Sequence, residues 1–487
     1  MSLYKDIVKV NDLMISEEAK ELQVKRLIQD MDMNSARLPD NIQLASIQFL
    51  DFRLFRNAEL NFAFPLTVLV GVNGKGKSSI LDAIAHHLSW LIARTTKTKG
   101  TGSSLFESDI SNVSSRGDTA QILVKYKIGA EIVVGSEEQK SGNVLNATLV
   151  AKKTLSASSV SSNLEGYTQY GEVVRVLKSA TGSINLPLLA SYGVERTCLM
   201  RKKNRSSDSF FYNKINQASV FQSALTGTKS FQPMAFTEWF ASLSKMSENA
   251  ANLEKRQKSN KSIFLMKSVL KSVVPGFQNI RLDQGKGADE IFICIDNSEV
   301  NFEQLSDGQR LFIALVADIV WRLIELNPVR DCPLNGHGIV LIDEIELHLH
   351  PTWQQIILPA LIRAFPGLQF IVTTHSPQVV STVPSDAVRL LNNDSGSKAK
   401  VIYTKPEVET KGRQSGDVLS EVMQTHPRPN IEEKRWLSDC YRLILSGRNE
   451  KNLEVARLLK KIQGHFGQSS IEYQSLSNLA RQRAREN

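Results

Sequence analysis

A glycine-rich loop at positions 71–78 is the first pattern in the sequence that could carry chemistry. It reads Gly-Val-Asn-Gly-Lys-Gly-Lys-Ser and fits the spacing G-x-x-x-x-G-K-[ST] at every defined position. Glycines in such a loop allow positive φ angles and a close backbone approach, so that successive N–H groups can point at a phosphate. A chance glycine-rich turn is the alternative. The lysine and serine that end the loop favour a site for a nucleoside triphosphate.

The residues of this loop have separate expected roles. Lys77 would reach the β- and γ-phosphates of ATP, and the Ser78 hydroxyl would ligate Mg²⁺. The other loop residues that we expect to contact the nucleotide are Asn73, Gly74, Lys75, Gly76 and Ser79. Arg53, in a polar turn before the loop, could reach the base or a phosphate, or it could form a surface ion pair.

Two adjacent carboxylates, Asp343 and Glu344, follow the apolar run at 338–342. A buried strand with this ending places both acids at the carboxyl edge of its sheet, where open α/β sheets bind ligands. Burying them unpaired would be costly. We expect Asp343 to orient Mg²⁺ and Glu344 to polarise the attacking water. A carboxylate pair that only caps the next helix is the structural alternative.

Three histidines lie near these carboxylates in the sequence. His375 ends the apolar run at 368–374, one helical crossover after Glu344, so its strand should reach the same sheet edge. His375 is therefore a candidate sensor of the γ-phosphate, although a lone histidine at a strand end is usually structural. His348 and His350 have a spacing that could suggest a metal, but nothing completes a ligand set, which favours a structural or subunit-contact role.

Alternating strands and helices would position these residues. The β-branched run at 64–70 predicts a buried strand before the loop, and 79–85 predicts a helix after it. Strand-like patterns also occur at 42–49, 120–126 and 147–151. The order strand, glycine loop and helix is the one in which a helix N-terminus can meet a phosphate.

The changes in pattern along the chain suggest five segments. One of them, an inserted lobe at 198–303, is too short for a long coiled coil and lacks the sustained heptads that one requires. Helical apolar spacing in the C-terminal segment (Trp436, Leu437, Tyr441 and Leu445 in its first helix) could pack on its own domain or on a partner chain. The segments are an N-terminal helical extension (1–40), a first ATPase lobe (41–197), an inserted, mostly helical lobe (198–303), a second ATPase lobe (304–405) and a C-terminal helical, partner-binding region (406–487).

Composition sets wider bounds on the protein. The 487 residues include 41% hydrophobic and 22% charged residues, which is ordinary for a globular chain. No apolar run reaches 18 residues, no signal-peptide pattern is present, and four scattered cysteines suggest neither disulfides nor zinc, so we expect a cytoplasmic protein. The net charge of +9 and the basic clusters at 201–205 and 481–485 leave room for DNA or another polyanion.

A third motif gives the chain a family resemblance. Leu305-Ser306-Asp307-Gly308-Gln309-Arg310, before a helical pattern at 311–324, resembles the signature sequence of ABC-type ATPases, in particular the RecF/SMC/OLD-like branch. Asp307 stands where transporters usually have glycine. The resemblance implies an α/β P-loop NTPase head with a mixed central sheet. It also implies a homodimer in which Ser306, Gly308 and Gln309 of one subunit close over ATP held by the other.

A narrower resemblance rests on the sequences at 191–196, 346–351 and 412–419, which look like those of the PtuA-type ATPases of Septu anti-phage systems. Similar ATPases accompany some retrons. This resemblance implies a separate HNH nuclease subunit of the PtuB kind as a partner. The chain itself shows neither an HNH cluster nor the strand-end acids of a fused TOPRIM nuclease. We therefore expect a slow ATPase that regulates a nuclease and has no nuclease activity of its own.

Two other functions compete with this interpretation. A DNA-repair clamp of the RecF kind would bind DNA junctions tightly and with strong salt dependence, without a dedicated nuclease. A transporter ATPase would need a membrane-embedded partner, and the substitution at Asp307 and the inserted lobe argue against it.

Overall fold

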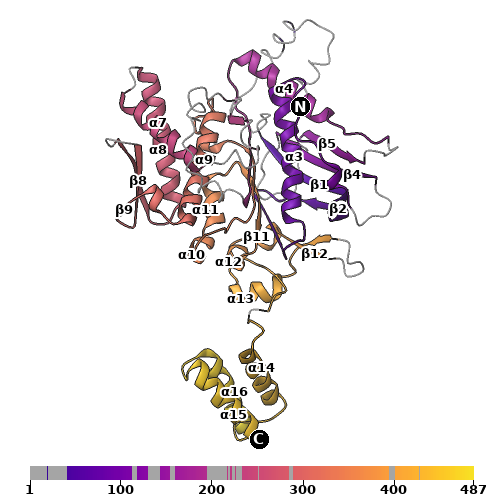
Figure 1. The fold of residues 1–487 in the computed structure, drawn as a ribbon, viewed down its shortest axis with the longest axis vertical. Coiled ribbons are helices and arrows are strands. Elements are labelled where there is room, and N and C mark those ends of the chain that lie inside the picture. Colours follow the sequence, from indigo (N-terminus) through magenta and orange to yellow (C-terminus); the bar gives the residue numbers. More distant parts are fainter. Residues whose placement is uncertain are drawn as a thin grey trace. The chain divides into compact units, whose positions relative to one another are not determined.

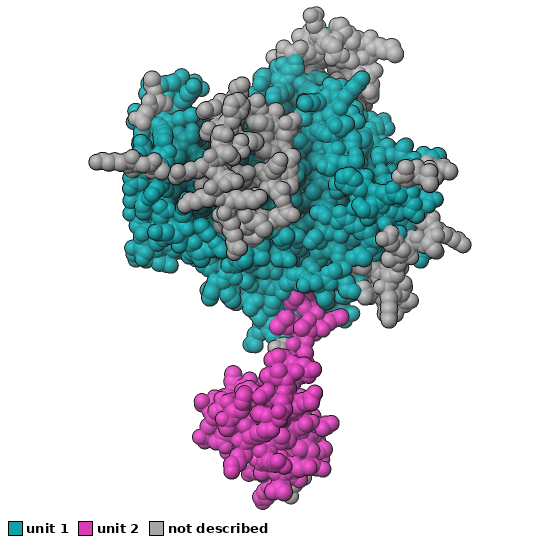
Figure 2. Space-filling model, in the orientation of Figure 1, with its two compact units in different colours: residues 1–418 teal, residues 419–487 magenta. Residues whose placement is uncertain are grey.

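The computed structural model describes residues 41–111, 118–129, 143–153, 159–194, 233–249, 252–284, 289–393, 401–426 and 428–486, with a few single positions. The expected N-terminal extension (1–40), the basic cluster at 201–205 and the positions 195–196 lie outside these residues. The chain forms two compact units, Met1–Val418 and Leu419–Asn487 (Figures 1 and 2). In the described part of the chain, no helix is long and apolar enough to cross a membrane.

A six-stranded mixed sheet forms the centre of the first unit, with the strand order β13-β12-β3-β11-β10-β6. The strands from β12 to β6 run parallel, and β13 is antiparallel to β12. This mixed α/β architecture is the one predicted from the sequence. The strands are β3 (Leu66–Gly71), β6 (Leu188–Tyr192), β10 (Gly338–Ile342), β11 (Leu368–Thr374), β12 (Val388–Asn393) and β13 (Val401–Thr404).

A second, antiparallel sheet has the order β2-β1-β4-β5. Buried residues alternate with more exposed ones along β4, as expected when one face of a sheet packs on a core and the other meets solvent. Its strands are β1 (Ile42–Phe52), β2 (Phe55–Asn61), β4 (Thr119–Ile128) and β5 (Asn143–Lys152).

Helix α3 (Lys77–Thr96) packs against both the central sheet and α4 (Glu165–Thr181), a helix that the sequence interpretation missed (Figure 1). His87 of α3 lies at this junction, and its ring nitrogens contact the Tyr167 hydroxyl at 2.7 Å and the Ile122 carbonyl at 3.1 Å. Complete burial lowers the pKa of His87 to about 3, so this imidazole is neutral at physiological pH.

The inserted lobe consists of α7 (Pro233–Asn249), α8 (Leu253–Val273) and a three-stranded sheet. The apolar patterns at 280–282 and 291–295 predict the first two strands as a hairpin-like pair, and the structure adds the third. Both helices pack against α9 (Asp307–Leu326), the helix that follows the signature motif. The three strands are β7 (Phe277–Gln284), β8 (Asp289–Ile295) and β9 (Ser298–Asn301).

A buried polar link joins α9 to the central sheet. The Tyr192 hydroxyl, at the end of β6, donates to Asp318 at 2.7 Å, and Arg322 Nε donates to the same carboxylate oxygen at 2.7 Å. All three side chains are nearly inaccessible to solvent. Because a buried charge is costly unless paired, this arrangement fixes the signature helix against the strand next to β10.

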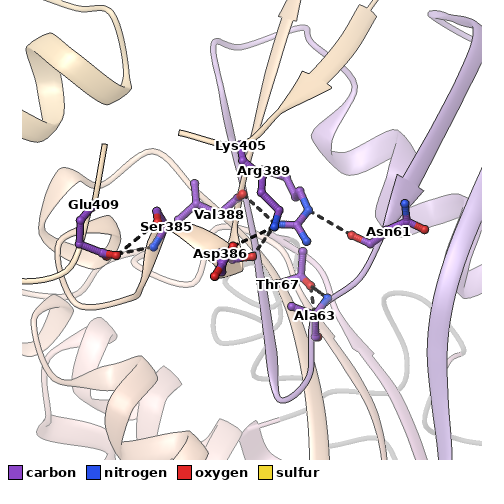
Figure 3. Close-up of polar contacts among 9 residues, drawn as sticks. All are labelled: Asn61, Ala63, Thr67, Ser385, Asp386, Val388, Arg389, Lys405 and Glu409. Atoms are coloured by element: carbon purple, nitrogen blue, oxygen red, sulfur yellow. Dashed lines mark hydrogen bonds and ion pairs between the residues drawn. The ribbon is translucent and has the colours of Figure 1, made fainter. Parts of the chain in front are cut away.

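The other edge of the central sheet is held by Arg389 at the start of β12 (Figure 3). Its side chain is only 4% exposed and donates to the carbonyls of Asn61, Asp386 and Val388. Asn61 ends β2, so this one guanidinium joins the two sheets. Lys405 also pairs with Asp386 at 2.8 Å, which ties the chain after β13 to the same turn.

Several short helices connect the larger elements. They are η1 (Glu107–Asp109), η4 (Phe302–Gln304), η5 (Pro333–Asn335), α10 (Pro351–Gln354), α11 (Ile357–Ala364), α12 (Pro377–Val380), η6 (Ser385–Ala387), α13 (Ser415–Asp417) and the π-helix η7 (Val418–Val422). The first unit extends past the expected boundary at 406, because Thr410 is fully buried and its hydroxyl donates to the Val383 carbonyl.

The second unit is a three-helix bundle with its own core. Its helices are α14 (Glu432–Leu445), α15 (Leu453–Phe466) and α16 (Ile471–Glu486). The apolar residues expected in α14 divide between the core of this unit and its surface. Cys440 and Ile444 face the core, whereas Tyr441 and Leu445 are 51% and 52% exposed. Positions 437, 440 and 444 follow the 3.6-residue period. Positions 441 and 445, which could pack on this domain or on a partner chain according to the sequence, lie beside this face.

Candidate functional site

The glycine loop lies between the end of β3 at Gly71 and the start of α3 at Lys77. Gly74 and Gly76 have φ angles of 78° and 87°, which lie in the left-handed region. A Cβ atom at Gly76 would come within 2.7 Å of the Phe55 ring, whereas one at Gly74 would meet nothing within 4 Å. The two positions therefore favour glycine for different reasons. At Gly74 the reason is backbone conformation alone, and at Gly76 it is backbone conformation together with close packing.

The first turn of α3 is built to receive an anion. Its N-cap residue, Gly76, provides no side-chain hydrogen bond, and the turn contains no acidic residue. The first N–H groups of a helix have no partner within the helix, and the helix dipole adds partial positive charge at this end. Backbone N–H groups and dipole together provide the chemistry of a phosphate site.

Lys77 lies beside these N–H groups and is 6% exposed. Its Nζ donates to the carbonyls of Gly71 and Val72 at 2.8 and 3.3 Å, which holds the amine against the loop. Burial lowers the pKa of Lys77, and the nearby carboxylates, Asp343 foremost, oppose that shift. An ammonium group has three donors, so a cation held in this way can also contact a phosphate.

Asp343 joins the loop to the centre of the sheet. Ser78 Oγ donates to Asp343 Oδ2 at 2.9 Å, although the two residues are 265 positions apart. The Thr373 hydroxyl, from β11, donates to the other oxygen of the same carboxylate. The backbone N–H of Asp343 donates to the Tyr192 carbonyl at 2.9 Å, so strands on both sides of β10 hold this residue.

Glu344 follows in a strained backbone conformation, with a φ of 48°. Its N–H donates to Thr373 Oγ1 at 2.7 Å, so Thr373 contacts both acids of the pair. Non-glycine residues with such angles persist where the surrounding structure holds them, and they cluster at functional sites.

His375 is placed by a third carboxylate, Glu346. One Glu346 oxygen accepts a hydrogen bond from the His375 N–H, and the other accepts one from the Thr374 hydroxyl at 2.7 Å. The imidazole of His375 is half-buried, directly after the end of β11. The strand carrying His375 therefore reaches the same sheet edge as the strand carrying Asp343, with β10 and β11 in parallel register.

The signature residues form a local arrangement at the start of α9. Ser306 is the N-cap, its Oγ accepts from the Gln309 N–H, and its N–H and hydroxyl both donate to Gln309 Oε1. Gly308 packs against the turn after Glu346, and a Cβ there would lie 2.1 Å from the His348 carbonyl oxygen. Asp307 pairs with Arg310.

The structure thus brings one group of the expected residues together and leaves another apart. Lys77, Ser78, Asp343 and Glu344 meet at one sheet edge, whereas within the described ranges no hydrogen bond joins Ser306 or Gln309 to the phosphate loop. Asn73 is exposed at the loop's tip, and the Lys75 N–H closes the loop onto the Val72 carbonyl at 3.3 Å.

Arg53 takes the ion-pair alternative. Its Nη1 contacts Asp82 at 2.7 Å and its Nε contacts Asp109 at 2.9 Å. Burial would lower the pKa of Arg53, but the hydrogen bonds that it donates to these two carboxylates raise it overall. Two carboxylates therefore hold this guanidinium beside α3, the helix that carries Asp82.

Sequence reasoning missed the roles of Thr373 and Glu346. Both side chains hydrogen-bond residues of the site, namely Asp343 and the backbone of Glu344 and His375. A signal for each was present. Two threonines end a buried, mostly apolar strand, and a third acid follows the Asp-Glu pair at a spacing of two.

The site's donor set fits ATP with Mg²⁺. An uncapped helix start and a buried lysine suit the phosphates, and the hydroxyl of Ser78 with the carboxylate of Asp343 offers the oxygen ligands that Mg²⁺ prefers. Across the residues described, no group of three His, Cys, Asp or Glu side chains could hold a metal alone. Mg²⁺ commonly takes its remaining ligands from phosphate and water, as such a site would require.

Comparison with known proteins gives two family matches. A model described as "AAA domain" matches residues 46–280, and one described as "AAA domain, putative AbiEii toxin, Type IV TA system" matches residues 281–381. The first range contains the phosphate loop, and the second contains the signature motif, Asp343, Glu344 and His375.

Two curated relatives extend over most of the chain. It is 27% identical to the "Retron Ec83 probable ATPase" of Escherichia coli, over 94% of this chain and 88% of that protein. It is 26% identical to the "Septu protein PtuA" of Bacillus mycoides (strain KBAB4), over 86% of this chain and 50% of that protein. Among solved structures, an Smc head bound to the C-winged helix domain of ScpA covers 75% of this chain with a TM-score of 0.43 and 15% identity.

Proposed function

We propose that this chain, a homologue of the retron ATPases and of the Septu protein PtuA, is the ATP-hydrolysing subunit of an anti-phage defence complex. The observation that carries the proposal is the meeting of Ser78 and Asp343 at 2.9 Å, beside Lys77 and an uncapped helix start. The phosphate loop and the acidic strand end come from distant parts of the sequence and are joined by a direct hydrogen bond.

Binding would begin at the first turn of α3. The N–H groups of the loop and the Lys77 ammonium would hold the β- and γ-phosphates, while Ser78 and Asp343 would orient the metal. Mg²⁺, when bound, would neutralise charge on the phosphate oxygens. Because Lys77 Nζ already contacts two loop carbonyls, the loop is preorganised before nucleotide arrives.

Hydrolysis requires a group that accepts a proton from water. Glu344 stands next to Asp343, and its backbone is fixed by Thr373, so it is the residue that we assign as the general base. His375, held through its backbone by Glu346, would contact the γ-phosphate and report its presence to the strand end.

A second copy of the chain would complete the site. The signature residues Ser306 and Gln309 bond each other and do not bond the phosphate loop of their own chain within the described ranges. In the sandwiched homodimer that we propose, they contact ATP held by the partner. Nucleotide would then favour the closed pair, and hydrolysis would release it.

A separate HNH nuclease would be the effector that this cycle controls. The sequence supports this division of labour, because it carries a complete set of ATPase motifs and no recognisable nuclease motif. The C-terminal three-helix unit is a candidate contact for such a partner, since Tyr441 and Leu445 are exposed on α14.

The test uses the purified full chain, alone and together with the product of any nuclease gene that neighbours its own. We expect slow phosphate release from ATP, no cleavage of plasmid or linear DNA by the chain alone, and cleavage when the nuclease is added. Light scattering should show twice the protomer mass with a non-hydrolysable ATP analogue. Efficient DNA cleavage by the isolated chain would reject the proposed division of labour. Tight, ATP-dependent binding to DNA junctions, with no nuclease encoded nearby, would instead favour a repair clamp.

A further inference from the structure

Helix α8 of the inserted lobe carries an unusual concentration of positive charge. Its 21 residues contain six basic side chains and a single carboxylate, Glu254. Like charges three or four positions apart, such as Lys258 with Lys261 and Lys267 with Lys271, destabilise a helix. The basic residues are Lys255, Arg256, Lys258, Lys261, Lys267 and Lys271.

The two faces of α8 differ in their surroundings. One face is buried against the rest of the unit, where α8 packs on α7 and α9 (Figure 1). This packing explains why the helix forms in spite of its charge repulsion, since tertiary packing supplies most helical stability. The buried residues are Ser259, Ser262, Met266, Val269, Leu270 and Val273.

The centre of the outer face carries one large aromatic side chain among polar ones. Phe264 is 68% exposed, and the positions one turn before and after it are Asn260 and Ser268. A phenylalanine exposed to this degree gains little from burial in its own fold. An aromatic ring flanked by amide and hydroxyl groups is suited to stacking against a nucleobase.

The cations flank this ring on both sides of the helix. Arg256 and Lys267 are eleven residues apart and share one side, since eleven residues make about three turns. Lys258 and Lys261 lie on the other side, and Lys271 continues the row beyond Phe264. From Arg256 to Lys271 the helix rises about 22 Å at 1.5 Å per residue, enough for several nucleotides.

Little of this charge is neutralised by the protein. Lys258 lies near Glu325 of α9, whose pKa is raised by burial and lowered in part by that lysine. Lys261 Nζ contacts the Asp331 carbonyl at 3.2 Å. Arg256, Lys267 and Lys271 form no ion pair with any carboxylate in the part of the chain that the structure describes.

We propose that the outer face of α8 binds a single-stranded nucleic acid, with the flanking cations on its phosphates and Phe264 stacked on a base. A membrane surface is a poorer match, because interfacial helices present a broad apolar face outward, and the apolar face of α8 is buried in the fold. Phosphate contacts give affinity without sequence preference, and stacking on an aromatic ring requires unpaired bases.

The first experiment measures binding of the full chain to a fluorescein-labelled thymidine 30-mer by fluorescence anisotropy. The double variant Arg256→Gln/Lys271→Gln should raise the Kd about tenfold. Each lost phosphate contact should also make the slope of log K against log salt less negative by about 0.7. The matched control, Lys125→Gln/Lys127→Gln, removes the same charge from an exposed face of β4 and should change neither quantity.

The second variant separates stacking from charge. Phe264→Ala should weaken binding about tenfold with an unchanged salt slope, and Phe264→Tyr should restore it. Thermal unfolding and ATP hydrolysis should stay at wild-type values in all of these variants, which excludes misfolding as the cause. The proposal is overturned if the α8 and β4 variants behave alike, if Phe264→Ala binds as tightly as wild type, or if the chain binds phosphatidylserine vesicles and not the oligonucleotide.

Discussion

Helices α3 and α9 both have 20 residues and both carry a nucleotide motif at their first turn, yet these turns are built differently. The start of α3 has a glycine N-cap, no side-chain cap and no acid. The start of α9 has the capping box of Ser306 and Gln309, and an aspartate at its first position. In a capped helix start, side chains already accept hydrogen bonds from some of the N–H groups that an anion would otherwise contact. This difference supports the proposal that the start of α3 binds phosphate within one chain. For α9 to meet a phosphate, the Ser306–Gln309 bonds would have to rearrange.

The largest expected effect concerns the cation at the start of α3. Lys77→Ala should lower ATP affinity about 100-fold or more, because it removes a buried charged contact to phosphate. Isothermal titration with ATP and Mg²⁺ measures this loss. Lys97→Ala is the matched control, since it removes the same charge from an exposed position at the other end of α3, and it should change the affinity much less. Equal losses in both variants would show that net charge, and not the position of Lys77, matters.

Next in size is the expected effect of changing Glu344, the carboxylate that we propose as the general base. Glu344→Gln should slow phosphate release about 100-fold or more while ATP binding persists, because the amide cannot accept the proton from water. Light scattering should then find the closed dimer trapped in the presence of ATP. Wild-type turnover in this variant would contradict the role of Glu344.

The buried His87 of α3 extends the comparison of the two helices to the pH dependence of stability. His87 in α3 has a folded pKa of about 3, below its ordinary value near 6.5, so the unfolded chain binds more protons between these values. Stability contributed by the neutral ring is complete above about pH 6.5, and it falls by about 1.4 kcal/mol per unit as the pH drops further. Denaturant unfolding between pH 7 and 5 measures the slope.

A His87→Gln variant is the control for this slope, since its side chain does not titrate. The variant's absolute stability should fall, because contacts with Tyr167 and Ile122 are altered, but its stability should depend less on pH. A slope identical to that of the wild type would assign the acid sensitivity to other groups.

A fourth change gives α3 the acid that its first turn lacks. Ser79→Asp places a carboxylate in the turn, where the dipole favours it by about 0.5 kcal/mol. The same carboxylate should repel phosphate and lower ATP affinity about tenfold. The thermal unfolding temperature should therefore rise while the ATP affinity measured by titration falls. Unchanged ATP affinity would mean that the α3 terminus does not hold the phosphates.

The smallest expected effect comes from removing the side-chain cap at the start of α9. Ser306→Ala removes the cap and should cost about 1 kcal/mol of stability, with ATP affinity of the single chain unchanged. ATP-dependent dimerisation should weaken, since the proposed intersubunit contact is lost. A matched Ser272→Ala change, away from the nucleotide motifs, should leave dimerisation as in the wild type. If Ser306→Ala weakens ATP binding by the single chain, the two helices do not divide their roles in this way.

The sequence by itself determined the elements and contacts that depend on short-range spacing. The order strand, glycine loop and helix is local, and so are the two acids that end an apolar strand. From these patterns the juxtaposition of Asp343 with the phosphate loop could be predicted, because parallel strands bring their carboxyl ends to one edge. The mixed α/β sheet was implied by the family resemblance of the signature motif.

Only the tertiary structure decided the contacts between residues far apart in the chain. Thr373 reaches Asp343 because β11 pairs with β10, and Arg53 meets Asp82 and Asp109 across three separate segments. The sequence also left open which apolar residues of α14 face its own core, because several of them compete for the core, and packing against α15 and α16 selects among them. Spacing along a chain determines which side chains share a face, whereas burial depends on which other segment packs against that face.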